Sequence, residues 1–369
     1  MQLVLAIIFF SAIAVQIIYF IVFLIGLNRK KSLRQNTHTL PVSVIVCAHD
    51  EEDNLRELIP LLLRQDYPNF EVVIIDDRSN DNTFDFLLDE AKKDHRLRMV
   101  HVNRTPPHVN SKKYSLTLGI KAAKYEWLLL TDADCRPESE KWISSMSNGF
   151  AEDKTFVLGF SPYVRTGGFL NLFIRFESLI TAVLYMAFGL LKNPYMGVGR
   201  NLAYRKSFFL AEKGFNQFMK VTGGDDDLFV NQHATGKNTE VIMGKDSVMY
   251  SIPEKSWRSF FRQKLRHLSV GKFYKFKHRF LLGTFMLTWL IAWALGIYLS
   301  ISSGIYYYYF TGAIALRLML FFFTLRTGFR NLEQKFEWWT IPFLDFLYMI
   351  YYLTTGLFTL GAKKVRWKN

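Results

Sequence analysis

The hydrophobic residues of this 369-residue chain are concentrated in long runs at its two ends. Residues 3–27 are almost unbroken by polar side chains. At 1.5 Å per residue, such a run is long enough to cross a hydrocarbon core of about 30 Å. Three further runs close the chain: 280–302, 305–325 and 338–360. We therefore predict a transmembrane anchor in residues 1–28 and a membrane region of two to three crossings in residues 280–362.

Basic residues indicate how these segments are oriented. A cleaved signal peptide needs a basic region before its apolar run. Here the basic residues come after the run: Arg29, Lys30, Lys31 and Arg34. The positive-inside rule then predicts that the following domain is cytoplasmic, at the plasma (inner) membrane.

The later basic residues create a conflict. They flank the C-terminal runs and fill the tail, residues 363–369. Three full crossings would place the 326–335 connector and the tail on opposite sides. Either one segment is re-entrant or interfacial, or the tail is translocated despite its charge. Arg317, inside the middle run, must face protein, snorkel or meet a lipid headgroup.

Residues 40–253 have a different pattern, in which short apolar runs alternate with helix-like periodicity. Four runs predict buried strands: 42–47, 72–75, 98–102 and 127–131. Helices are predicted between and after them: one opening at 49–52 and ending before Pro68, then 84–91 and 115–123. This alternation predicts an α/β fold with a mainly parallel sheet and helices on both faces.

Residues 169–187 also place apolar side chains at helical spacing, but Arg175 and Glu177 argue against a crossing helix. We expect a core helix here. The alternative is an interfacial helix that holds an acceptor near the bilayer.

Composition narrows the class of protein. Half of the residues are hydrophobic, which excludes a disordered chain, and two cysteines exclude a disulfide framework or a cysteine-rich zinc site. A net charge of +14 indicates nucleic acid, anionic lipid or a phosphorylated small molecule as partner. The basic residues of 254–279 are interleaved with aromatic ones and lead directly into an apolar run. That order favours an amphipathic segment on an anionic membrane surface over nucleic-acid binding.

Two pairs of carboxylates follow predicted strands. Parallel α/β sheets bind their ligands at the carboxyl ends of the strands. Asp132 and Asp134 repel each other unless a cation neutralises them, and their hard oxygens suit Mg²⁺ or Mn²⁺, which also holds substrate phosphates. Asp76 and Asp77 can accept hydrogen bonds from a nucleobase or a ribose hydroxyl. The alternatives are a solvated strand-end turn for the first pair and a capping turn for the second.

A third acidic cluster, Asp225 to Asp227, follows two glycines. Repulsion among its carboxylates can raise one pKa into the range of a general base. The alternatives are a helix N-terminus, which is compatible with that role, and a second metal site. Lys112, in a polar stretch, could meet a diphosphate as a point charge, or be an ordinary loop lysine. Gln263 and Arg266 could turn toward a phosphate.

Taken in order, these segments resemble family-2 glycosyltransferases with the GT-A-type, Rossmann-like fold, in the branch related to cellulose, hyaluronan and ceramide sugar transferases. The resemblance covers about residues 41–267, and it is carried by CAHDEEDNL, VVIIDDRSNDNT, SKKYSLTLGIKAA, WLLLTDADC, GVGRNLAYR, GGDDDLF and QKLRH. It implies a GT-A-type domain in residues 40–253.

The resemblance also implies residue roles. It assigns nucleotide-sugar contacts to Ala48, Glu51, Asp76, Asp77, Lys112, Asp132, Gln263, Arg266 and His267. It assigns metal binding to Asp134 with Asp132, and catalysis to Asp225 and Asp226, with Asp226 as the base. His267 stands where the family has a Trp that helps processive synthases hold the growing chain. This departure favours transfer of a single sugar.

The expected function is therefore inverting transfer of one sugar from a nucleotide-diphosphate sugar, most plausibly a UDP-sugar, with Mg²⁺ or Mn²⁺ as cofactor. The acceptor is a hydroxyl of a lipid or a membrane-associated glycan, and nucleic acid is not a partner. Three alternatives stay open: a processive polysaccharide synthase, a polyprenyl-phosphate sugar transferase, and a membrane scaffold whose nucleotide-binding domain is not catalytic.

Overall fold

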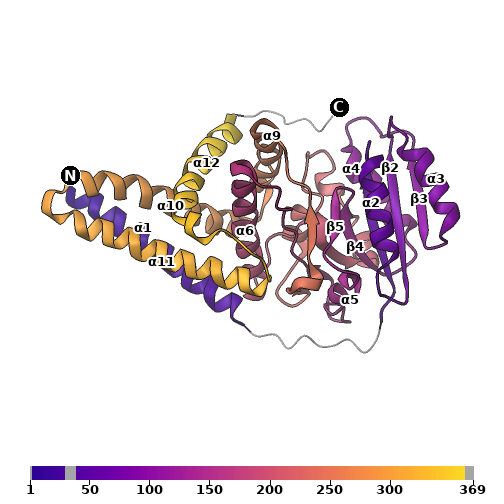
Figure 1. Ribbon diagram of the computed structural model, residues 1–369, viewed down its shortest axis with the longest axis horizontal. Helices are drawn as coiled ribbons and strands as arrows, with labels where there is room; N and C mark the ends of the chain where they lie inside the picture. The colour runs from indigo at the N-terminus through magenta and orange to yellow at the C-terminus, as the bar shows by residue number, and fades with distance from the viewer. Residues whose placement is uncertain (1, 30–38, 362–369) are drawn as a thin grey trace.

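The computed structural model describes residues 2–29 and 39–361 and consists of an α/β domain joined to a group of long helices (Figure 1). The α/β domain contains a seven-stranded sheet with the order β3-β2-β1-β4-β7-β6-β8. Its strands are β1 (Val42–Ala48), β2 (Phe70–Asp77), β3 (Leu97–Val102), β4 (Trp127–Asp132), β6 (Phe156–Leu158), β7 (Leu202–Arg205) and β8 (Thr239–Val241). Only β7 runs antiparallel to its neighbours, so the prediction of a mainly parallel sheet is confirmed. A second, two-stranded sheet pairs β5 (Cys135–Pro137) with β9 (Met249–Ser251).

The helices of this domain follow the apolar periodicity. In α2, Leu55, Leu58, Ile59 and Leu62 are buried, which is one face of a helix. The helices are α2 (Glu52–Leu63), α3 (Thr83–Lys93), α4 (Ser111–Ala122), α5 (Trp142–Ser147), α7 (Lys206–Ala211), α8 (Asp227–His233) and α9 (Trp257–Leu268). Short 3₁₀ turns occur at Gly199–Asn201, Asn216–Phe218, Lys245–Ser247, Gly271–Phe273, Gly304–Tyr306 and Trp338–Thr340.

One helix begins earlier than its pattern predicted. We expected a helix from residue 115, but α4 begins at Ser111 because the side chain of Asn110 accepts a hydrogen bond from the backbone N–H of Lys113. Lys112 therefore lies in the first turn of a helix and not in a loop.

Three long helices, α1 (Gln2–Leu27), α10 (Phe276–Ser302) and α11 (Tyr307–Asn331), extend away from the sheet domain side by side (Figure 1). At the far end, the side chain of Gln2 donates to the carbonyl of Ser302 at 3.5 Å. At the end next to the domain, Asn331 donates to the carbonyl of Leu27 at 2.6 Å. All three are long and apolar enough to cross a membrane. Helix α10 therefore runs antiparallel to α1 and α11, which run in the same direction.

The fourth apolar run forms α12 (Ile341–Gly361), which stands across these three helices in Figure 1, next to α9. It is not among the helices that qualify as membrane spans in the described part of the chain. Because α10 leaves the domain and α11 returns to it, the basic residues before α10 and those near Arg330 lie at the same end. The tail, residues 363–369, lies outside the described residues, so both alternatives for the C-terminal segments stay predictions.

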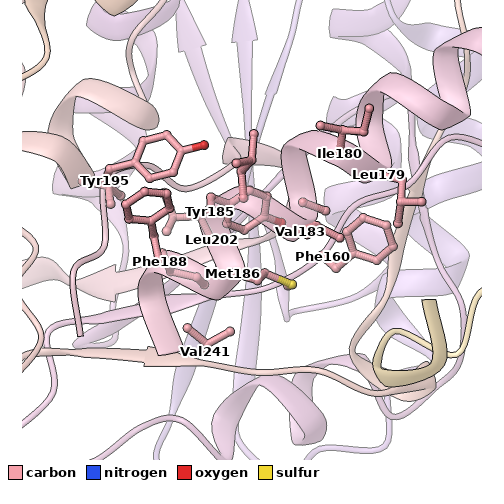
Figure 2. Close-up of a cluster of buried hydrophobic side chains, with 14 of the residues drawn as sticks. Phe160, Leu179, Ile180, Val183, Tyr185, Met186, Phe188, Tyr195, Leu202 and Val241 are labelled. Atoms are coloured by element: carbon pink, nitrogen blue, oxygen red, sulfur yellow. The ribbon is translucent and has the colours of Figure 1, made fainter. Parts of the chain in front are cut away.

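Helix α6 (Gly168–Leu190) lies between the long helices and the sheet (Figure 1). It qualifies as a span by length and composition, but 78% of its apolar window is buried within the protein. Figure 2 shows Ile180, Val183 and Met186 of this helix packed near Phe160 and Val241. The expectation of a core helix is therefore confirmed, and α6 joins the two parts of the molecule.

Arg317 of α11 faces the protein interior and not the lipid. Its guanidinium pairs with the carboxylate of Asp345 on α12, and both side chains are almost completely buried. Trp293 of α10 donates to the same carboxylate at 2.7 Å, and Gln16 of α1 lies 3.4 Å from the guanidinium. This pair therefore ties α12 to all three long helices.

We expect Arg317→Met to lower the free energy of unfolding by about 3–5 kcal/mol, because it leaves Asp345 as an uncompensated buried charge. Thermal unfolding in detergent measures the effect. The double variant Arg317→Met/Asp345→Leu should recover most of the loss, and Arg326→Met, at an exposed position of α11, should change little. Equal stability of Arg317→Met and the native protein would show that the pair does not hold the helices together.

Candidate active site

A cavity of about 1110 Å³ lies at the carboxyl ends of β1, β2 and β4. The register of the parallel strands aligns these ends, with Ala48 opposite Asp76 and Cys47 opposite Asp132. The cavity is lined by most of the residues singled out in the sequence: Ala48, Glu51, Asp77, Lys112, Asp132, Asp134, Asp225, Asp226, Gln263, Arg266 and His267. The structure thus brings the three acidic clusters to one place. Their individual roles remain predictions.

Lys112 lies between two of the acidic clusters. Its Nζ donates to Asp132 Oδ1 at 3.0 Å and lies 3.4 Å from Asp225 Oδ2. Desolvation lowers the pKa of this lysine, but attraction by Asp132 and Asp225 outweighs it and raises the pKa well above its usual range. Lys112 is therefore a permanent cation in the middle of the cavity.

Asp226 is the N-cap of α8, and both of its carboxylate oxygens accept backbone hydrogen bonds. Gly199 N–H donates to Oδ2 at 2.6 Å, and Asp227 N–H donates to Oδ1 at 2.7 Å. A Cβ atom at position 199 would lie 3.2 Å from that Oδ2, so only glycine allows this approach comfortably. Desolvation, followed by repulsion from Asp225, raises the pKa of Asp226. The pKa of Asp225 itself is lowered, because Lys112 and Lys113 outweigh its desolvation.

The loop before α8 is held by a buried lysine. The Nζ of Lys113 donates to the carbonyls of Phe218, Val221 and Gly223 at 2.6–2.9 Å. Desolvation lowers the pKa of Lys113 to about 8. Two consecutive residues of α4 thus have different tasks: Lys113 fixes the loop, and Lys112 faces the carboxylates.

Helix α8 is also bound to the segment that leads into the membrane helices. Tyr274 donates to Asp227 Oδ2 at 2.7 Å, and Lys275 N–H donates to the side chain of Asn231 at 2.8 Å. Desolvation and repulsion from Asp226 raise the pKa of Asp227 well above its usual range. The position of Asp226 therefore depends on the segment that leads into α10.

From the sequence we expected both Asp76 and Asp77 to contact the nucleotide, but only Asp77 lines the cavity. Successive residues of a strand point to opposite faces of the sheet, so only one of Asp76 and Asp77 can face the cavity. Asp76 is completely buried, 2.7 Å from Nδ1 of His101, and accepts from the N–H of Ser79 at 3.2 Å. Asp77 lines the cavity. The adjacent acidic residues therefore divide into one that braces the loop and one that is available to a ligand.

Helix α9 lines the cavity with three basic residues, Arg262, Lys264 and Arg266. Tyr163 O–H donates to Gln263 Oε1 at 3.4 Å, and Lys264 pairs with Glu177 of α6. Desolvation, together with the positive charges of Arg266 and Lys264, holds the pKa of His267 well below its usual range. His267 is therefore neutral at physiological pH.

Arg200 was missed as a site residue by reasoning from the sequence. It lines the cavity, and its guanidinium lies over the ring of Tyr163, 4.5 Å from the centroid. Although desolvation opposes it, attraction by Tyr163, Cys135 and Asp134 raises its pKa. The signal in the sequence was the segment Gly197–Val198–Gly199–Arg200, where two glycines allow close approach of the backbone.

The residues present fit a divalent cation that arrives with a phosphorylated ligand. Desolvation and repulsion from Asp132 raise the pKa of Asp134, so a cation between the two carboxylates would relieve their repulsion. Within residues 2–29 and 39–361, no group of three or more His, Cys, Asp or Glu side chains gathers to form a complete cage. Mg²⁺ is commonly held by one or two carboxylates together with substrate phosphates, and this donor set matches that mode.

Comparison with known proteins identifies the domain. Residues 43–210 match Glycosyl transferase family 2, and the chain carries a domain of this family. It is 27% identical over 155 residues to an uncharacterized glycosyltransferase of Haemophilus influenzae, covering 42% of this chain and 44% of that protein. It is 34% identical over 95 residues to the poly-beta-1,6-N-acetyl-D-glucosamine synthase of Staphylococcus epidermidis, covering 25% of this chain and 21% of that protein.

A solved structure shares the fold. The mannosyltransferase of Pyrobaculum calidifontis, in complex with GDP-Man and Mn²⁺, superposes with a TM-score of 0.61 at 16% identity, covering 90% of this chain and 98% of that one. The fold is therefore of the GT-A type, as the sequence predicted. The chain spans less than half the length of the two curated relatives named above.

We expect Asp76→Asn and Asp77→Asn to have different effects. Asp76→Asn weakens the buried contacts to His101 and Ser79 and should lower the free energy of unfolding by about 1–3 kcal/mol with little change in nucleotide affinity. Asp77→Asn should weaken nucleotide binding with a smaller effect on stability. Thermal unfolding and titration calorimetry with a nucleoside diphosphate measure the two quantities. Loss of affinity only in Asp76→Asn would reverse these assignments.

Proposed function

We propose that the protein is an inverting glycosyltransferase that moves one sugar from a nucleotide-diphosphate sugar, of the UDP-sugar class, to a hydroxyl of a lipid or a membrane-associated glycan. The proposal rests mainly on one observation: Asp77, Lys112, Asp134 and Asp226, far apart in the sequence, line one cavity at the carboxyl ends of the strands. The fold neighbour, which was solved in complex with GDP-Man, supports a nucleotide-sugar donor.

The donor would lie across the strand ends. Asp77 would accept hydrogen bonds from the base or ribose, with Ala48 and Glu51 alongside. Lys112, Arg200 and Arg266 would surround the diphosphate with positive charge, which stabilises the charge that develops on it as it departs. A Mg²⁺ or Mn²⁺ ion held by Asp134 with Asp132 would supply further neutralisation of the same diphosphate.

Asp226 would act as the base. Its raised pKa makes it a better proton acceptor than Asp225, which is paired with Lys112. It takes the proton of the acceptor hydroxyl while that oxygen forms a bond to the anomeric carbon. The bond from this carbon to the diphosphate oxygen breaks on the opposite face, and its electron pair leaves with the nucleoside diphosphate. A single displacement of this kind inverts the anomeric configuration.

The membrane arrangement supports a cytoplasmic site. Arg29 follows the end of α1, Arg279 lies near the start of α10 and Arg330 near the end of α11. These three helix ends lie next to the α/β domain (Figure 1). The positive-inside rule places this end in the cytoplasm, where nucleotide sugars are made available to a plasma-membrane enzyme.

A panel of nucleotide sugars tests the proposal. Purified protein in detergent is incubated with each donor and Mn²⁺, and released nucleotide is measured. Release with one donor, and a product that carries a single added sugar, is the expected result. A polymeric product would identify a processive synthase. Binding of a donor without release or transfer would instead identify a non-catalytic scaffold.

We expect Asp226→Asn to lower kcat by about 10²–10⁴-fold and leave nucleotide affinity nearly unchanged, because it removes the base and keeps the size of the side chain. Calorimetry and initial rates separate the two effects. An active Asp226→Asn enzyme would point to an acceptor that is already anionic, such as a polyprenyl phosphate.

The same assignment predicts a pH dependence. Because the pKa of Asp226 is raised, the carboxylate becomes protonated at a higher pH than an ordinary aspartate, whose pKa is about 3.9. The rate should therefore fall as the pH decreases through that raised value. A kcat/KM profile that stays flat down to about pH 4 would contradict the role of Asp226.

We expect Asp134→Ala to remove the part of nucleotide affinity that depends on metal. Titration of a nucleoside diphosphate with and without Mn²⁺ should show enhancement in the native protein and none in the variant. Glu57→Ala, at an exposed carboxylate outside the cavity, is the control. Undiminished enhancement in Asp134→Ala would place the metal elsewhere.

A further inference from the structure

The cavity does not end at the carboxylates but continues toward the membrane helices. Beyond Asp226 and Tyr274 its walls are formed by α6, α10 and α12, through residues that include Thr181, Ala182 and Tyr352. The reacting carboxylates and the membrane region therefore share one continuous space.

The contribution of α10 comes from a single face near its start. Arg279, Leu282, Gly283 and Met286 line the cavity at the i, i+3, i+4 and i+7 positions expected of one helical face. At 1.5 Å per residue, this face extends about 10 Å along the helix. Helix α10 continues to Ser302 without lining the cavity any further, and no described residue of α1 or α11 lines it.

The distance that the cavity extends along α10 distinguishes a polymer that crosses the membrane from an acceptor that stays in it. A polymer that is extruded during synthesis needs a path through the whole thickness of the membrane, about 30 Å of hydrocarbon. The described part of the chain encloses a space that reaches only the first turns of α10. The geometry therefore suits an acceptor that stays in the membrane and presents its reacting group at the surface.

Gly283 marks an opening in the wall of α10. It is exposed, it lines the cavity, and a Cβ atom there would meet nothing within 4 Å. It lies one turn beyond Arg279, at the boundary between the basic segment and the apolar run. An opening at this level would lead from the carboxylates to the outer part of the hydrocarbon region.

We propose that the acceptor is a membrane lipid, whose hydroxyl headgroup reaches Asp226 and whose hydrocarbon chain leaves the cavity over Gly283 into the bilayer. This inference rests on the proposed glycosyl transfer. The lipid hydroxyl gives its proton to Asp226, its oxygen bonds to the anomeric carbon, and the nucleoside diphosphate leaves with the electrons of the broken bond. Leu282 and Met286 supply apolar surface to the chain beside the glycine.

The test places a large side chain in the opening. Gly283→Trp fills the space over α10, and Gly312→Trp is the matched control, because Gly312 is an exposed glycine of α11 that also has no atom within 4 Å of a Cβ but does not line the cavity. The full chain is placed in phosphatidylcholine vesicles that contain dioleoylglycerol, ceramide or undecaprenyl phosphate. Sugar transfer is measured with a radiolabelled UDP-sugar panel as label extracted into organic solvent. Affinity for UDP with Mn²⁺ is measured in parallel.

For the native protein we expect label in the lipid fraction with dioleoylglycerol or ceramide, and label only with undecaprenyl phosphate would overturn the hydroxyl acceptor. Gly283→Trp should lower it at least 10-fold with unchanged affinity for UDP, and Gly312→Trp should behave as the native protein. Equal lipid labelling by Gly283→Trp and the native protein would overturn the proposed path. Label only in a water-soluble glycan, or nucleotide release with no labelled lipid, would overturn the lipid acceptor while leaving a glycosyltransferase. Absence of both nucleotide release and transfer with every donor would instead contradict the proposed function itself.

Discussion

The structure depends on the gathering of carboxylates around one lysine in a poorly solvated cavity. Asp132 and Asp225 both lie within ion-pair distance of Lys112, and Asp134 and Asp226 line the same space. Charges of one sign repel strongly when water is excluded. Desolvation, followed by repulsion from a neighbouring carboxylate, raises the pKa values of Asp134 and Asp226. Lys112 offsets part of this repulsion. The repulsion that Lys112 does not offset favours the binding of a ligand that brings positive charge together with its phosphates.

The fold supplies the positions that this arrangement needs. Parallel strands bring Asp77 and Asp132 to one edge of the sheet, and a glycine at position 199 lets the backbone approach Asp226. Bonds from Tyr274 and Lys275 connect α8 to the first membrane helix after the domain. The carboxylate site and the membrane region are thus held together by hydrogen bonds. The cavity extends from one to the other.

The sequence alone was sufficient for strands β1 to β4, several helices and the three acidic clusters, because burial and periodicity are local properties. It did not predict the short strands β5 to β9, which have only three or four residues each. It could not distinguish Asp76 from Asp77, since the direction of a side chain at a strand end depends on which face the loop covers. The helical position of Lys112 depended on a cap from Asn110, and the membrane arrangement depended on the pair between Arg317 and Asp345. Arg200 was overlooked because its carboxylate neighbours are distant in sequence.

The most direct test of the account is an anomalous-scattering map of crystals grown with Mn²⁺ and a nucleoside diphosphate. We expect a manganese peak between Asp134 and the diphosphate, with the ammonium of Lys112 turned from Asp132 toward a phosphate oxygen. A nucleotide bound outside the cavity, or manganese on carboxylates other than those of Asp132 and Asp134, would contradict it.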